Sequence, residues 1–478
     1  MTAKAENNRQ DALPLEEVLR AIPEEITETG ESTDPLGELI DRISTRKVPV
    51  NSFSRLWALG NMQAKVTIGY LAYALRSSFS NKTAKQKLLN ETHLKAALKL
   101  LATMGYLRGA VMKVGQLLSN MPHIVPGEVI DTLERLQFEA PPMHYSLIRE
   151  VFLDEFGKDP REVFATFDKQ AFAAASLGQV HRATLKSGEE VAVKIQYPSM
   201  AATIRSDLAN MRKILLPMKL KKEGRYLAGH LKDVESVLLG ETDYRKEAKL
   251  LKEAHRFFTP EDAIVVPRVW AEYSTDRVLT TDLLKGRHAA DFLKENPDQA
   301  SRDRFGTLIS RAIFRLWGKA RTIYADPNPG NFLLLDDGRL GLIDFGCCRT
   351  LTEEEWQFQI KSENALMQGD LENLQEVVAI ACLYKNSAEM EPERLALLIE
   401  LSLWQGEPAI KEGPFDFGDR EFYQRGLDIF TELTRKGHIR NNSLYIWWTR
   451  LIFGHRTLLY RLGSKVDYRG IYLREKTY

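Results

Sequence analysis

The sequence predicts an α+β protein with a small β-rich lobe followed by a larger helical lobe. Strand patterns gather between residues 164 and 283, whereas the chain before and after them shows chiefly helical periodicity. At 478 residues the chain is also long enough to bury more than one core. We expect four parts in order: a mobile acidic tail (1–50), a helical extension (51–142), the β-rich lobe (143–285) and the helical lobe (286–478).

Composition excludes several classes of protein. With 66 basic and 65 acidic residues, the net charge of +1 supplies no field that favours nucleic acid. The three cysteines include the adjacent pair Cys347 and Cys348, which suits a reducing compartment better than a disulfide framework. The first 35 residues hold nine acids and three bases, which opposes both a secretory signal and a mitochondrial transit peptide. A cytoplasmic protein is therefore expected.

A membrane-spanning helix is not expected, because no stretch of about 18 uncharged apolar residues occurs. The nearest approach is the segment 444–453, which is short and contains Arg450. Its length favours a buried C-terminal helix.

Helical periodicity marks the N-terminal extension. Apolar stripes run along 55–76 and 94–118, and Pro141-Pro142 separates this block from the lobe that follows. Beyond the first strands, two more long helical stretches are expected, over 201–222 and 229–257.

Strands are expected where β-branched and aromatic residues alternate between turn signals. The first two, 172–185 and 190–195, are joined by the turn Ser187-Gly188. Further strand patterns cover 264–273 and 277–283. The last two expected strands, 332–335 and 340–343, form a hairpin around the turn Asp336-Asp337-Gly338.

Candidate catalytic residues lie on either side of that hairpin. Asp326 precedes Asn331 by five positions, and Asp344 heads a DFG triplet. Phosphoryl transfer needs this combination, because one Asp orients or deprotonates the acceptor while the Asn and the second Asp hold Mg²⁺ against nucleotide phosphates. The motifs therefore predict an ATP site with metal ligands Asn331 and Asp344.

Lys194, which follows Val191-Ala192-Val193, ends a strand pattern and can reach the phosphates. Taken alone, Lys194 would be interpreted as a solvent-exposed charge at the edge of a sheet. The presence of Asp326 and Asn331 later in the chain favours a phosphate-binding role instead. A lysine in this place needs an anionic clamp. Glu241, Asp243 and Glu247 can supply it from one helix, with Asp243 and Glu247 on a shared face, and the alternative is a mixed-charge solvated helix.

Two further motifs are weak by themselves. A run of small residues stands where a kinase has its Gly-rich phosphate loop: Ala173, Ala174, Ala175 and Ser176. Alanine should make that turn stiffer than glycine would. Such runs often indicate only close packing. Lys113, Gly115 and Gln116 lie in a helical stretch, where a small residue at a helix crossing is the plainer explanation.

Together and in this order, the motifs resemble those of the UbiB/AarF family of atypical protein-kinase-like proteins. The resemblance covers about residues 90–350 and includes Lys-x-Gly-Gln at 113–116, the alanine run, Val-Ala-Val-Lys at 191–194, Glu-x-Asp at 241–243, and the DFG triplet. It implies a bilobal protein-kinase-like fold whose N-terminal extension packs over the active site.

The resemblance also implies roles. Lys194 would contact the α- and β-phosphates and pair with Glu247, and Asp326 would be the catalytic-loop Asp. Lys113, Gly115 and Gln116 would face Glu241 and Asp243 as a regulatory motif. Members are associated with ubiquinone and other isoprenoid-lipid pathways, often at a membrane surface. ATP with Mg²⁺ and an isoprenoid lipid or quinone-biosynthesis enzymes are thus expected. A peripheral membrane contact would use an amphipathic helix, with 55–76 as the first candidate, although core packing is the favoured role of that helix.

Two positions depart from the family pattern. Tyr324 stands where the family often has His. The family motif at 326–331 is commonly Asp-Pro-His-Pro-Gly-Asn, and Asn328 replaces its His. Two other functions stay open at this point. The chain could be a protein Ser/Thr kinase with Asp326 as base, or a nucleotide-sensing pseudokinase scaffold for lipid-biosynthesis enzymes.

Overall fold

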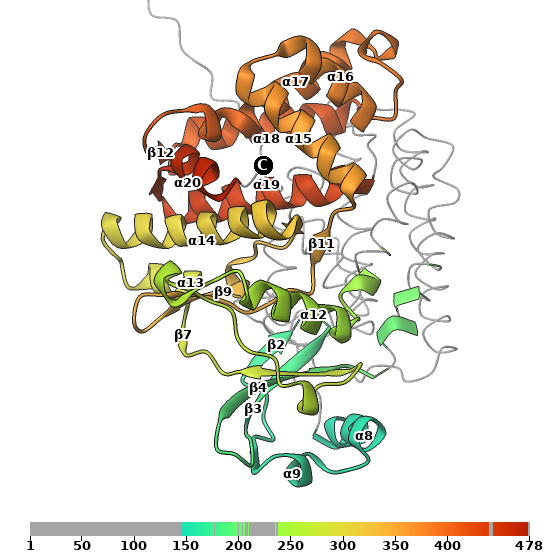
Figure 1. Cartoon of the computed structure of the whole chain (residues 1–478), viewed down its shortest axis with the longest axis vertical. Coiled ribbons are helices and arrows are strands. Elements are labelled where there is room, and N and C mark those ends of the chain that lie inside the picture. Colours follow the sequence, from blue (N-terminus) through green and yellow to red (C-terminus); the bar gives the residue numbers. More distant parts are fainter. Residues whose placement is uncertain are drawn as a thin grey trace, which may run out of the picture. The chain divides into compact units, whose positions relative to one another are not determined.

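Residues 145–438 and 443–476 are described by the computed structural model, except 176, 199, 203, 206–208, 210–234 and 236–237, and all of them belong to one structural unit (Figure 1). The predicted α+β class is confirmed. The expected helices at 55–76, 94–118 and most of 201–222 lie outside the described residues.

The first sheet is antiparallel and is built on alternating apolar residues. In β4 the side chains of Val191, Val193 and Ile195 are fully buried, and Lys194 between them points to the other face. The strand order is β1-β3-β4-β6, and β2 pairs with β3 on the same edge as β1. The strands are β1 (Thr166–Phe167), β2 (Ala173–Ala175), β3 (Gly178–Thr184), β4 (Glu190–Gln196) and β6 (Val278–Asp282).

The expectation of one strand over 172–185 is wrong. The chain reverses direction between Ala175 and Gly178, which pair with each other, so that the alanine run becomes an edge strand of a hairpin. Gly178 is needed there, because a Cβ at this position would lie 2.1 Å from the carbonyl oxygen of Ile195. The predicted strand 190–195 is confirmed, with one more residue.

An aromatic cluster fills the space beside this sheet. Phe152 and Phe164 are buried, with ring centroids 6.0 Å apart, and Phe167 contacts both of them. These rings join the sheet to α8 (Tyr145–Phe156) and α9 (Pro160–Val163).

The helix expected over 229–257 is interrupted. Residues 241–243 form a turn, and α12 (Tyr244–His255) begins after it with Asp243 as its N-cap, whose side chain accepts a hydrogen bond from the Lys246 backbone. Because Asp243 caps this helix, it cannot share a helical face with Glu247, and that expectation is wrong.

A second sheet has the order β5-β10-β9-β7. The predicted hairpin is confirmed as β9 (Phe332–Leu335) and β10 (Leu340–Leu342). Of the expected strand 264–273, only β5 (Ile264–Val265) forms, and Ala271–Tyr273 is a 3₁₀ turn. The sequence analysis missed β7 (Gly286–His288), which pairs with β9.

The rest of the chain is helical with short strand pairs, as expected after residue 286. In Figure 1, α14 runs beside α19, and α15 to α18 gather with α20. The helices are α13 (Ala289–Lys294), α14 (Gln299–Ala320), α15 (Glu353–Gln368), α16 (Leu371–Ala381), α17 (Pro392–Ile410), α18 (Arg420–Arg435), α19 (Ser443–Leu462) and α20 (Tyr468–Glu475). The paired strands are β8 (Thr322–Tyr324) with β11 (Cys348–Thr350), and β12 (Phe415–Asp416) with β13 (Lys465–Val466).

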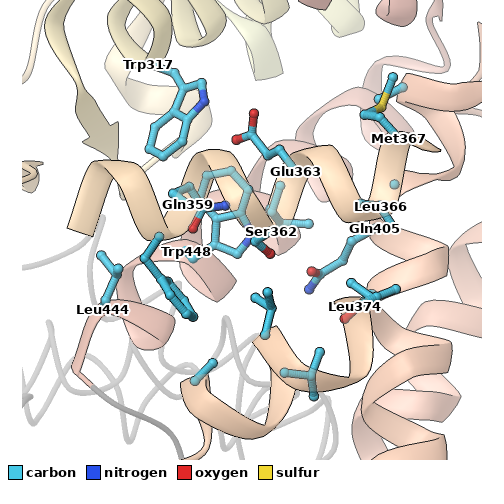
Figure 2. Close-up of a pocket in the computed structure, with 18 of the residues that line it drawn as sticks. Trp317, Gln359, Ser362, Glu363, Leu366, Met367, Leu374, Gln405, Leu444 and Trp448 are labelled. Carbon is cyan, nitrogen blue, oxygen red and sulfur yellow. The ribbon is translucent and has the colours of Figure 1, made fainter. Parts of the chain in front are cut away.

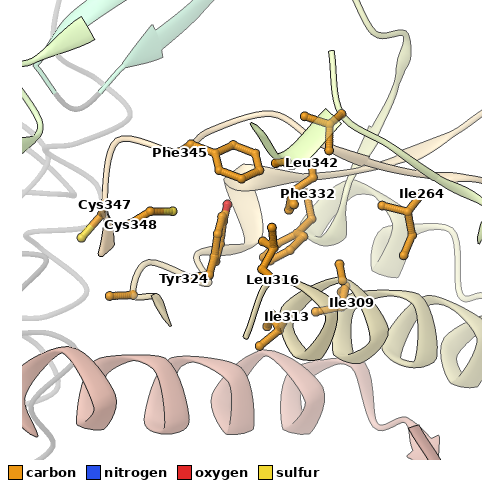
Figure 3. Packing of buried hydrophobic residues seen from close by; sticks show 14 of the residues in the cluster. Ile264, Ile309, Ile313, Leu316, Tyr324, Phe332, Leu342, Phe345, Cys347 and Cys348 are labelled. Atoms are coloured by element: carbon orange, nitrogen blue, oxygen red, sulfur yellow. The ribbon is translucent and has the colours of Figure 1, made fainter. Parts of the chain in front are cut away.

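The expected buried C-terminal helix is confirmed as α19. Leu451, Leu458 and Leu462 belong to the same core as Tyr324 and Phe345, part of which is shown in Figure 3. Within the described part of the chain, none of the helices is long and apolar enough to cross a bilayer. Cys347, Cys348 and Cys382 are all buried, and no disulfide joins them.

Candidate nucleotide site

Lys194 joins three segments that are far apart in the sequence. Its Nζ lies 2.9 Å and 3.0 Å from the two carboxylate oxygens of Glu247, and 3.0 Å from Oδ2 of Asp344. Lys194 comes from the middle of β4, Glu247 from the first turns of α12, and Asp344 from the segment after β10. The ammonium group thus bridges two carboxylates.

Burial makes this triad sensitive to charge. The Glu247 side chain is 2% exposed and that of Lys194 is 16% exposed. Burial raises the pKa of Glu247 to about 7, although the attraction of Lys194 opposes that shift. Burial alone would lower the pKa of Lys194, but the carboxylates of Asp344 and Glu247 raise it well above its usual value. Lys194 is therefore held as a cation, which can bind a phosphate.

Asn331 and Asp344 lie at the same end of the β9–β10 hairpin. The backbone N–H of Ile343 donates to the carbonyl of Asn331 at 3.2 Å, which fixes the two residues on adjacent segments. The amide nitrogen of Asn331 donates to the Asp326 carbonyl at 2.8 Å, so its amide oxygen is the atom that remains for a ligand. One carboxylate and one amide oxygen are hard ligands of the kind that Mg²⁺ takes beside substrate phosphates.

That pair of ligands fits a metal ion carried by a nucleotide better than one held by protein alone. Among the residues that the structure describes, no group of three or more His, Cys, Asp or Glu side chains could hold a metal ion. Mg²⁺ is usually held by one or two protein ligands together with phosphates and water. The residues present therefore fit Mg²⁺ bound with ATP.

Tyr324 links the segment that contains Asp326 to the DFG segment. Its hydroxyl donates to the backbone carbonyl of Asp344 at 2.8 Å, and its ring meets that of Phe345 edge to face with centroids 5.7 Å apart (Figure 3). The N–H of Ala325 also donates to the carbonyl of Cys347 at 3.0 Å. Tyr324, although it departs from the family pattern, therefore forms a polar contact between the segment of Asp326 and the DFG triplet.

Asn328, the second departure, shapes the loop itself. Its side-chain oxygen accepts the backbone N–H of Gly330 at 2.9 Å, and it caps the 3₁₀ turn Pro329–Asn331. The turn places Asn331 directly before β9.

The carboxylate of Asp326 faces a buried arginine from the C-terminal helix. Arg450 Nη2 lies 3.8 Å from Asp326 Oδ1, and the Arg450 side chain is 7% exposed. One turn further along α19, a Cβ on Gly454 would lie 2.6 Å from the Pro327 ring. One face of α19 thus packs directly against the catalytic-loop segment.

Glu241 belongs to the surroundings of the same arginine. Burial lowers the pKa of Arg450, whereas Cys347, Asp326 and Glu241 raise it, and the net shift is upward. Glu241 is 5% exposed. Asp243, in contrast, is exposed and caps α12.

The other predicted site residues fall into two groups. Ala173, Ala174 and Ala175 form β2, at the edge of the sheet that carries Lys194. Ser176, Lys113, Gly115 and Gln116 lie outside the described residues.

Sequence reasoning missed two residues of this site. Arg450 was considered only as a charge that interrupts an apolar helix, yet a lone arginine among buried apolar residues needs an acidic partner, and that signal could have found it. Tyr244 is buried, and the Lys194 ammonium lies 5.3 Å from its ring centroid. No spacing rule in the sequence indicates that contact.

Comparison with known proteins agrees with this geometry. Residues 135–378, just over half of the chain, match the ABC1 atypical kinase-like domain. The chain is 30% identical over 74% of its length to "Atypical kinase COQ8B, mitochondrial" of Danio rerio and 31% identical over 66% to "Atypical kinase COQ8, mitochondrial" of Saccharomyces cerevisiae. It spans 58% and 62% of the lengths of those two relatives.

A solved structure shows the same fold. The complex of Rv3197 with erythromycin from Mycobacterium tuberculosis superposes with a TM-score of 0.52 at 26% identity, covering 81% of this chain and 97% of that one. The fold and the Lys–Glu–Asp triad define a kinase-like protein. The chain belongs to the ABC1 atypical kinase-like family, which contains the COQ8 and AarF proteins, and the predicted kinase-like fold is confirmed.

Proposed function

We propose that this protein binds ATP with Mg²⁺ and acts as an atypical kinase or ATPase that supports isoprenoid quinone, ubiquinone-type, or other lipid metabolism. The observation that carries the proposal is the position of Lys194 Nζ, within 3.0 Å of both Glu247 and Asp344. Two carboxylates beside a buried lysine keep its ammonium group charged and hold it in one position, as phosphate binding requires.

Each residue has a stated role in this proposal. Lys194 binds the α- and β-phosphates, and Glu247 orients it. Asp344 and Asn331 hold the metal ion, which neutralises charge on the phosphates when it is bound. Asp326, near the cation of Arg450, orients the acceptor hydroxyl or water. The hairpin of Ala173, Ala174, Ala175 and Ser176 covers the phosphates.

The acceptor and the pathway come from the relatives. Two of them carry the name COQ8 and are described as mitochondrial, and the quinone pathway is proposed for this chain on that resemblance. The proposed boundaries are a helical extension to residue 142, a β-rich lobe to 285 and a helical lobe beyond it. Lys113, Gly115 and Gln116 of the extension would act together with Glu241 and Asp243.

Asp344→Asn tests the site. The variant keeps the shape of the side chain and removes its charge, so Mg-ATP affinity measured by titration calorimetry should fall by about tenfold or more, while metal-free ATP binding changes less. Asp337→Asn is the matched control, because Asp337 is an exposed aspartate at the tip of the same hairpin that pairs with Arg339. Undiminished Mg-ATP affinity in Asp344→Asn would remove Asp344 from the proposed metal site.

Turnover distinguishes the remaining alternatives. Phosphate release, measured with and without lipid vesicles or detergent, should be present and should depend on Asp326. Nucleotide binding without any release would favour a pseudokinase scaffold. Efficient phosphate transfer to unrelated proteins would favour a protein Ser/Thr kinase.

A further inference from the structure

A cavity of about 130 Å³ lies among the helices of the C-terminal part, separate from the residues of the nucleotide site. Its walls come from α14, α15, α16, α17, α19 and α20. Figure 2 shows Trp317, Trp448 and Leu444 on one side of it, and Leu366, Leu374 and Gln405 on the other. For scale, an apolar cavity of about 150 Å³ in another protein binds benzene.

A buried cation lines this apolar space. Arg456 of α19 is 1% exposed, and it lines the cavity. Its Nη2 donates to the carbonyl of Gln405 at 3.0 Å, and its guanidinium lies 4.4 Å from the ring centroid of Tyr468. The Phe417 ring centroid lies 5.2 Å from the guanidinium, and Arg456 also forms a side-chain hydrogen bond with Tyr468.

The guanidinium has no acidic partner among the described residues. Within the described part of the chain Arg456 forms no ion pair, and its Nε and Nη1 have no hydrogen-bond partner. The side-chain Nε2 of Gln405, which also lines the cavity, likewise has no partner among the described residues. A fully buried charge without a counter-ion is strongly destabilising, so these donors indicate an anionic ligand.

The cavity holds one other charged group, Glu363 of α15. Its Oε2 accepts the hydroxyl of Tyr472 at 2.7 Å, and it forms no ion pair with Arg456. Glu363 disfavours a second negative charge on any ligand, and it does not neutralise the guanidinium by direct contact. A ligand with one anionic end therefore fits better than a dianion such as a phosphate ester.

We propose that this cavity binds a small monocarboxylic acid whose apolar body is the size of one ring. The carboxylate would accept one hydrogen bond from Arg456, through Nε or Nη1, and one from Gln405 Nε2. The apolar part of the acid would lie against the apolar walls of the cavity, which include Trp448 and Leu374. Arg456 suits this role because its guanidinium stays charged when it is buried.

Benzoate is the probe, with benzamide and benzylamine as neutral and cationic analogues of the same size. Titration of the full chain by calorimetry or ligand-observed NMR should show saturable binding of benzoate. Benzamide and benzylamine should bind about tenfold more weakly or not at all, because a charged hydrogen-bond pair is lost. Absence of saturable benzoate binding at millimolar concentration, or equal binding of benzamide, would overturn the proposal.

Two variants locate the binding. Arg456→Met should weaken benzoate binding at least about tenfold and remove the preference for benzoate over benzamide. Leu374→Trp should fill the cavity and abolish binding, whereas Leu371→Trp on the exposed side of the same helix should leave it intact. If Arg456→Met fails to fold, the comparison of Leu374→Trp with Leu371→Trp still shows whether benzoate binds in this cavity. Benzoate binding that survives in folded Leu374→Trp would place the ligand elsewhere.

Discussion

The hydroxyl of Tyr324 donates to the backbone carbonyl of Asp344 at 2.8 Å, and this bond ties the strand before Asp326 to the residue proposed to hold the metal ion. Tyr324 belongs to the same core as Phe345, the residue after Asp344. Burial raises the pKa of the Tyr324 hydroxyl well above its usual value, so it remains a donor at all physiological pH values.

Tyr324→Phe should lower the free energy of unfolding by about 1–2 kcal/mol, because it leaves a partly buried carbonyl without its donor. It should also weaken Mg-ATP binding, since Asp344 is then less firmly placed. Denaturant unfolding and nucleotide titration measure the two effects. Tyr324→His restores a donor and should recover part of the loss, and a Phe variant that matches wild type in both assays would show that this bond is unimportant.

Arg450→Met should reduce turnover more than nucleotide affinity. The guanidinium lies beside Asp326 and not beside the Lys194 triad, so phosphate release should fall by as much as about a hundredfold as Asp326 loses its orientation. Arg450→Lys keeps the charge but loses the planar fork, and should show an intermediate rate. A larger loss in Mg-ATP affinity than in turnover would contradict this assignment.

Gly178→Ala should destabilise the first sheet by about 1–3 kcal/mol, because its methyl group would overlap the Ile195 carbonyl next to Lys194. Thermal unfolding should reveal the loss. Gly240→Ala is the matched control, since its methyl group would meet only the flexible end of Lys246 at 3.9 Å. Equal stability of the two variants would show that β3 can move away from β4 at little cost.

Ala174→Gly should change nucleotide affinity. Ala174 pairs with Gln179 in a strand of only three residues, and glycine adds backbone freedom to the hairpin that would cover the phosphates. Dissociation constants for ATP and ADP, measured side by side for the variant and wild type, provide the test. Identical constants would count against a phosphate-covering role for this hairpin.

A buried ionic network should make stability depend on pH in the acid range. Arg315 of α14 pairs with Asp262 and with Glu475 of α20, and all three are at most 6% exposed. Burial raises the pKa of Asp262, but the hydrogen bond from Arg315 and other contacts outweigh it and lower the pKa to about 2. The pKa of Glu475 is lowered as well, again against the effect of burial.

Because these carboxyl groups have lower pKa values in the folded protein than in the unfolded chain, their contribution is complete above about pH 5 and is lost as the pH falls towards 2. The melting temperature should therefore drop between pH 5 and pH 3. Arg315→Met should cost about 3–5 kcal/mol at neutral pH and should flatten that acid dependence. An acid dependence unchanged in the variant would assign it to other groups.

Local patterns were sufficient for the elements whose side chains alternate or repeat regularly. The strand expected at 190–195 and the hairpin of β9 and β10 follow from periodicity and turn residues, and the helix α19 follows from the length of its apolar segment. The single strand expected over 172–185 failed because apolar alternation continues through a tight turn. Likewise, helical periodicity continued through 241–243, where Asp243 ends one segment and caps the next.

What the amino-acid order determined by itself is the kinase-like class and the set of chemical groups, because Lys194, Asp326, Asn331 and Asp344 stand in motifs whose spacing is local. Only the tertiary structure decided which charges meet: Lys194 with Glu247 53 positions away and with Asp344 150 positions away, and Asp326 with Arg450. The physical reason is that a buried charge needs a partner in space, and packing of the sheets and of α19 selects that partner without a fixed separation along the chain.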